Sequence, residues 1–110
     1  MIDLAFITGI ISYDDLSLLK NSDLSSQAND LKEDMLQVEY SSSLLLDVGW
    51  YPSFDPCGHF QIRVIKDYDW NTPFFLSKAT TVPLLIEELI FAQDKINRVF
   101  GAEHGGNAHK

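Results

Sequence analysis

Residues 44–78 read LLLDVGWYPSFDPCGHFQIRVIKDYDWNTPFFLSK and decide the fold that the sequence predicts. Three runs with strand character are separated here by two loops. The first loop, residues 52–58, holds two prolines and a glycine, which favour turns. The second loop, residues 67–71, is acidic and aromatic. Because short connections join antiparallel neighbours, the stretch predicts a three-stranded antiparallel meander.

The strands of this meander are indicated by alternating side chains. Residues 37–48 alternate between apolar and polar types, which predicts one half-buried strand. Residues 59–66 (HFQIRVIK) alternate cleanly, with Ile62 and Val64 expected to point inward. A third, shorter strand is predicted over residues 73–77, where a proline at the start suits an edge strand or a first position.

The first third of the chain predicts short helices. Residues 1–11 suit a helix or a strand, and an apolar i, i+4, i+8 spacing favours a helix. Ser12, followed by two carboxylates, resembles a capping box, and a helix is expected from there to Asn21. Asp23 would cap another helix, with apolar side chains at helical spacing as far as Met35.

Residues 80–83 (TTVP) open the strongest helix signal, because a threonine cap is followed by a proline in the first turn. The apolar stripe of this helix comprises Val82, Leu85, Ile86, Leu89, Ala92, Ile96 and Val99. Gly101 should end the helix. The prediction is therefore an α+β fold in which short N-terminal helices precede the meander and a long C-terminal helix packs on the sheet. Residues 1–101 should form a single domain and residues 102–110 a flexible polar tail.

Composition and charge limit the classes of function. The chain has 110 residues, with 16 acidic and 8 basic side chains and a formal charge of −8. A nucleic-acid-binding protein needs a basic face, and an anionic membrane surface attracts cations, so neither partner is expected. A cationic partner fits this charge, although acidity that serves solubility alone is an equal alternative. No apolar run approaches the ~20 residues of a membrane span.

Cysteine usage indicates a reducing compartment. Cys57 is the single cysteine, so an internal disulfide is impossible, and a cytoplasmic location is the simplest expectation. The opening residues are apolar but include Asp3 and lack a basic region, so they do not resemble a signal peptide.

Few side chains suggest catalysis. Cys57 and His59 flank a turn and could form a reactive thiol–imidazole pair, although an ordinary loop cysteine is the simpler interpretation. His104 and His109 lie in the predicted tail, which would make a poor metal site. Phosphate loops and serine elbows are absent from the sequence. The chain is therefore not expected to be an enzyme or to carry a metal or cofactor.

Aromatic and acidic residues gather where the predicted strands turn. Aromatic anchors surrounded by carboxylates suit a protein interface with a basic partner. The predicted partner-binding residues are Asp47, Trp50, Tyr51, Asp55, Asp67, Tyr68, Asp69 and Trp70. As alternatives, each tryptophan could belong to the core, and Asp67 and Asp69 could be solvated turn residues.

Several short motifs resemble a known family. Residues 47–52 (DVGWYP), 54–56 (FDP) and 58–60 (GHF), followed by residues 67–71 (DYDWN) ahead of Pro73, are similar to small bacterial immunity proteins. These proteins are the cognate antitoxins of contact-dependent growth inhibition and related polymorphic toxin systems. The resemblance covers about half of the chain, from Asp47 to Val99, and excludes the N-terminal third.

The resemblance implies a non-catalytic, cytoplasmic toxin inhibitor that binds the C-terminal toxin domain of a cognate effector. Many such toxins are nucleases whose clefts are basic because they bind phosphates. An acidic inhibitor would complement such a cleft, and a ribonuclease is the favoured target. A generic acidic adaptor domain and a small thiol enzyme using Cys57 and His59 are the alternatives. The oligomeric state stays open.

Overall fold

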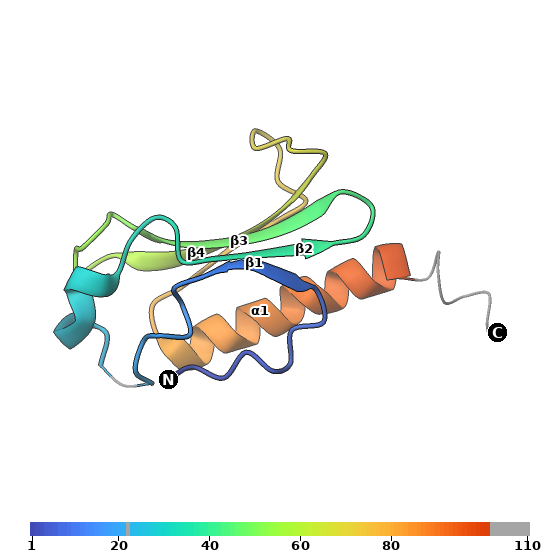
Figure 1. Ribbon diagram of the computed structural model, residues 1–110. Helices are drawn as coiled ribbons and strands as arrows, with labels where there is room; N and C mark the ends of the chain where they lie inside the picture. Colours follow the sequence, from blue (N-terminus) through green and yellow to red (C-terminus); the bar gives the residue numbers. More distant parts are fainter. Residues whose placement is uncertain (22, 102–110) are drawn as a thin grey trace.

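The computed structural model describes residues 1–21 and 23–101, so the predicted tail at residues 102–110 lies outside the described residues. Figure 1 shows the arrangement of its helices and strands. They are β1 (Ile10–Asp14), the short 3-10 helix η1 (Ser25–Asp30), β2 (Leu36–Tyr40), β3 (Leu44–Tyr51), β4 (His59–Lys66), β5 (Phe75–Ala79), α1 (Val82–Ile96) and the π-helical turn η2 (Asn97–Gly101). The expected α+β class and the C-terminal helix are confirmed.

The five strands form one antiparallel sheet in the order β1-β2-β3-β4-β5, so each strand pairs with its neighbour in sequence. The predicted three-stranded meander is therefore too small. Residues 37–48 are two strands, because a turn at residues 41–43 separates β2 from β3. Ser42 and Ser43 adopt φ angles of 65° and 59° there. Serine continues a polar alternation without the glycine or asparagine that usually marks such a turn.

The predicted N-terminal helices are wrong except for η1, a short 3-10 helix inside the range where a helix was expected from Asp23 to Met35. β1 occupies the region where a capped helix was expected, and η1 is the only helix described before α1 within residues 1–21 and 23–81. Short polar side chains explain the difference, because they satisfy backbone N–H groups outside a helix. Asp14 accepts hydrogen bonds from both the backbone N–H and the hydroxyl of Ser17, and Asp23 accepts the same pair from Ser25.

α1 covers one face of the sheet (Figure 1) and contributes side chains to the hydrophobic core. Thr81 caps this helix as predicted, because its hydroxyl accepts a hydrogen bond from the backbone N–H of Leu84. The side chains that α1 buries are Val82, Leu85, Leu89, Ala92 and Ile96. They face an apolar layer from the three central strands, namely Val38, Leu44, Leu46, Val48, Trp50, Phe60, Ile62 and Val64.

Tyr40 links the sheet to the helix at the far end of this layer. Its hydroxyl donates a 2.6 Å hydrogen bond to Gln93 Oε1 on α1, and Gln93 Nε2 donates to the carbonyl of Phe6. Burial raises the pKa of Tyr40 to about 12, because the phenolate would lose its hydration there. The N-terminal segment, the sheet and the helix are thus joined at one point.

Over residues 1–21 and 23–101, no helix combines the length and the apolar character that crossing a bilayer would require.

Candidate partner-binding surface

Among the described residues, no helix lies over the second face of the sheet (Figure 1), and we call it the open face. Here the loop between β4 and β5 rises on the side opposite α1 (Figure 1). One register row crosses all five strands of this face: Tyr13, Gln37, Asp47, Arg63 and Leu76. Strand alternation places all five side chains on the same side. The open face is therefore polar at its centre, where the covered face is apolar.

An ion pair lies at the centre of this row. Arg63 Nη2 is 2.9 Å from Asp47 Oδ2, and Gln37 Nε2 donates to Asp47 Oδ1 at 3.3 Å. The same guanidinium nitrogen donates to the Tyr51 hydroxyl at 3.3 Å. Asp47 is only 3% exposed. Its carboxylate therefore neutralises Arg63 within the sheet and offers little surface to a partner.

The loop between β4 and β5 covers part of the row. The ring of Trp70 stacks on Arg63, with 4.9 Å between the guanidinium carbon and the ring centroid. The loop begins with a tight turn, because the N–H of Asp69 donates to the carbonyl of Lys66. Thr72 donates a hydrogen bond to the Asp69 carboxylate, which holds the pKa of Asp69 below its usual value. Trp70 remains 41% exposed and Tyr68 is 77% exposed.

A second acidic segment lies close over the sheet at Glu33 and Asp34. The segment is fixed by backbone bonds on both sides, from Met35 N–H to the Val48 carbonyl and from Trp50 N–H to the Lys32 carbonyl. A Cβ at Gly49 would lie 2.0 Å from the Glu33 carbonyl oxygen. Because glycine alone lacks that atom, Gly49 permits the segment to approach the sheet this closely.

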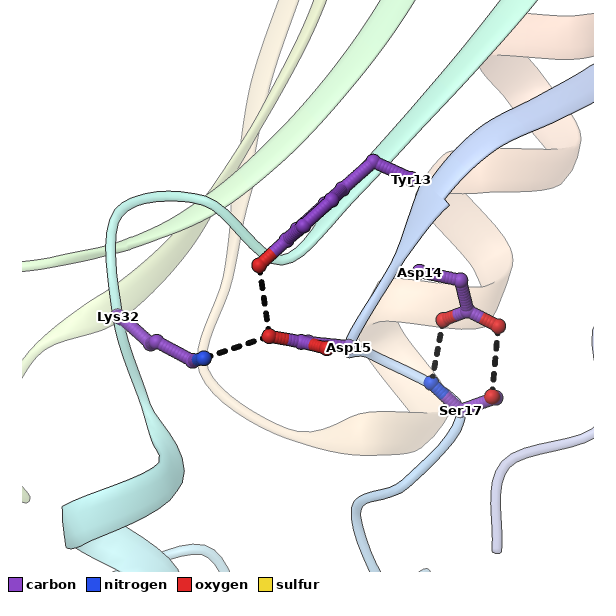
Figure 2. Close-up of polar contacts among 5 residues, drawn as sticks. All are labelled: Tyr13, Asp14, Asp15, Ser17 and Lys32. Carbon is purple, nitrogen blue, oxygen red and sulfur yellow. Dashed lines mark hydrogen bonds and ion pairs between the residues drawn. The ribbon is translucent and has the colours of Figure 1, made fainter.

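The end of β1 is held by a small polar network (Figure 2). Lys32 Nζ lies 2.5 Å from Asp15 Oδ2, and the Tyr13 hydroxyl donates to the same oxygen at 2.6 Å. These bonds hold the pKa of Asp15 below its ordinary value, with Lys32 contributing more than Tyr13. The charge of Lys32 is thus matched by Asp15, as that of Arg63 is matched by Asp47.

Between these features the open face is hollowed. One depression of about 490 Å³, which we call the sheet hollow, is lined by Ser12, Tyr13, Asp34, Gln37 and Glu39. A smaller one of about 160 Å³ shares Gln37 and Glu39 and reaches Leu45 and Tyr68. The two depressions therefore adjoin, and the ionisable side chains that line them are acids and tyrosines.

The structure places some of the predicted contact residues on the open face and gives others a role inside the fold. Asp67, Tyr68, Asp69 and Trp70 lie together in the loop over the open face, where Trp70 stacks on Arg63, the ion-pair partner of Asp47. Tyr51 is half-buried beside Arg63. Trp50 is 1% exposed and belongs to the core, where its ring meets Phe60 edge-on at 4.8 Å.

Asp55 stabilises the loop at residues 52–58 through hydrogen bonds. Its carbonyl accepts the 2.8 Å hydrogen bond of the Trp50 indole, and its carboxylate accepts the backbone N–H of Cys57. These contacts give Asp55 a structural role that the sequence does not show.

Sequence reasoning missed the sheet hollow itself, because none of its lining residues was among the predicted contacts. Gln37 and Glu39 alternate with buried positions in β2. The alternation therefore predicts that both side chains point outward, but it does not predict that they contact a partner. Tyr13 was placed in a helix, and β1 becomes recognisable only through its β-branched residues Ile10 and Ile11.

The cysteine alternative finds no assembled site. Cys57 is exposed and unpaired, and no hydrogen bond joins it to His59 in the part of the chain that the structure describes. Within that part, no group of three or more His, Cys, Asp or Glu side chains is placed to hold a metal ion.

Comparisons with known proteins give no relative: no protein-family model, curated protein or solved structure matches this chain.

Proposed function

We propose that this protein is a bacterial immunity protein that binds the toxin domain of a growth-inhibition effector in the cytoplasm and neutralises it without catalysis. The toxin would be a basic nuclease, with a ribonuclease favoured, and the open face would make the contact. The proposal joins the motif resemblance in residues 47–73 to the surface chemistry of that face.

The observation that carries the proposal is uncompensated negative charge beside exposed aromatic rings. Lys32 and Arg63, two cations near the hollow, are paired with Asp15 and Asp47. The exposed acids around the hollow, Glu33, Asp34 and Glu39, have no described ion-pair partner within residues 1–21 and 23–101. A basic cleft would meet these free carboxylates together with Tyr68 and Trp70.

The test is co-expression with the product of the gene adjacent to the one that encodes this protein. The tagged protein should co-purify with that product, and its expression should restore growth to cells that the product alone arrests. Restored growth without a physical complex, or a complex that leaves the toxin active, would overturn neutralisation by binding.

A charge-removal pair locates the contact. Asp67→Asn with Asp69→Asn removes two charges while asparagine keeps the turn, since it tolerates positive φ and still accepts hydrogen bonds. Toxin affinity should fall about three- to tenfold, mainly through slower association. Glu87→Gln with Glu88→Gln removes the same charge from α1 and should change affinity less than about twofold. Equal losses in both pairs would exclude the loop as the contact.

A generic acidic adaptor is the alternative. It would use the same face and would bind a basic protein that is not toxic when expressed alone. The growth assay separates the two, because an adaptor complex would form without any arrest to relieve.

A further inference from the structure

The open face offers a binding site of definite chemistry. We infer that the sheet hollow and the adjoining depression at Tyr68 receive an arginine side chain from a loop of the basic partner. The inference rests on the proposed function, because it assumes a cationic protein partner. It goes further by naming the side chain that is bound and the residues that bind it, which are Asp34, Glu39, Tyr13 and Tyr68.

The charge of the hollow selects a cation. Asp34 and Glu39 line it and are exposed, and no ion pair of theirs is described in residues 1–21 and 23–101. Lys32, the nearest cation along the chain, is held by Asp15 (Figure 2). Carboxylates spaced around a depression attract an incoming cation and repel an anion.

The rings beside these acids favour a guanidinium. Tyr13 lines the hollow and is 39% exposed, while Tyr68 lines the depression that shares Gln37 and Glu39. A guanidinium stacks on an aromatic face and bonds a carboxylate with two parallel donors, which a lysine ammonium cannot do in the same way. The sheet itself already contains one such stack, between Arg63 and Trp70.

Tyr68 presents its ring from an unusual backbone conformation. Asp67 and Tyr68 adopt φ angles of 55° and 60°. Tyrosine is disfavoured in this left-handed region, where glycine and asparagine are preferred. A large ring that is 77% exposed contributes little to the core, so packing does not explain its presence at a strained position. Contact with a partner does explain it.

The experiment uses the full chain labelled with ¹⁵N and two capped synthetic peptides, hexa-arginine and hexa-lysine, titrated by NMR at about 0.15 M salt, where long-range attraction is screened. Hexa-arginine should give saturable shifts at Tyr13, Gln37, Glu39 and Tyr68. Its affinity should exceed that of hexa-lysine by about fivefold or more. Shifts centred on α1, or equal affinities for the two peptides, would overturn the inference.

Matched variants complete the test. Asp34→Asn with Glu39→Gln should weaken hexa-arginine binding about tenfold, because two contacting charges are lost. Glu87→Gln with Glu88→Gln changes the net charge equally and should leave binding within about twofold. Equal weakening by both pairs would mean that only net charge matters. If the hollow pair binds the toxin normally in the co-expression assay, the arginine site fails while the immunity function stands.

Discussion

The two faces of the sheet are built from the same strands and differ in side-chain polarity and in their contribution to stability. On the covered face, Leu46, Val48 and Ile62 are wholly buried beneath α1. On the open face, the alternate positions of the same strands include Asp47 and Arg63, which pair with each other across β3 and β4. The covered face supplies stability through apolar burial, and the open face can vary its charge at lower cost to the fold.

The covered face should be the more sensitive to truncation. Trp50→Ala removes a buried ring and the indole bond to Asp55, so the free energy of unfolding should fall by about 3–5 kcal/mol. Trp70→Ala removes the same side chain from the open face and should cost about 0.5–1 kcal/mol through the lost stack on Arg63. Urea denaturation followed by circular dichroism measures both. Equal losses would mean that Trp70 also belongs to the core.

The ion pair is the most sensitive part of the open face. Asp47→Asn leaves Arg63 without its counter-charge in a mostly buried setting, and the expected loss is about 1–3 kcal/mol. Asp94→Asn on α1 removes one carboxylate from the exposed pair with Arg98 in η2 and should cost about 0.5 kcal/mol or less. Urea midpoints compare the two variants. A loss at Asp47 no larger than that at Asp94 would show that solvent already screens Arg63.

A small effect on stability, of the opposite sign, is expected at Tyr68. Tyr68→Gly relieves the positive φ and should raise the free energy of unfolding by about 0.5–1 kcal/mol, while hexa-arginine binding weakens. Ser42→Gly, at a similar φ in the turn between β2 and β3, should stabilise without affecting binding. Thermal melts and peptide titrations of both variants give the comparison. Unchanged binding by Tyr68→Gly would remove that ring from the site.

Regions with one dominant signal were predictable. β4 spans His59–Lys66 as expected, since its side chains alternate from His59 to Val64, and Thr81 caps α1 because a threonine precedes Val82 and Pro83. The N-terminal third failed because the apolar spacing of Leu24, Leu31 and Met35 matches a helix, although these residues reach the core from loops on either side of η1.

The site was only half predictable for a different reason. The loop with Tyr68 and Trp70 is contiguous in sequence, so its composition is visible there. The hollow depends on register, which brings Tyr13 beside Gln37 and Gln37 beside Asp47. Neither pairing nor the close approach at Gly49 has a sequence signal of its own, because both arise from contacts between distant segments.

The nearest-neighbour order of the sheet has a consequence for synthesis on the ribosome. Each strand can pair with the one made just before it, so the hairpins need no distant segment to form. The apolar layer nevertheless lacks the side chains of α1 until Val82–Ile96 has emerged, because α1 follows all five strands. Nascent chains that stall before this point would expose the apolar face of the sheet and could aggregate. Docking of α1 on the sheet is therefore the step that protects the nascent chain.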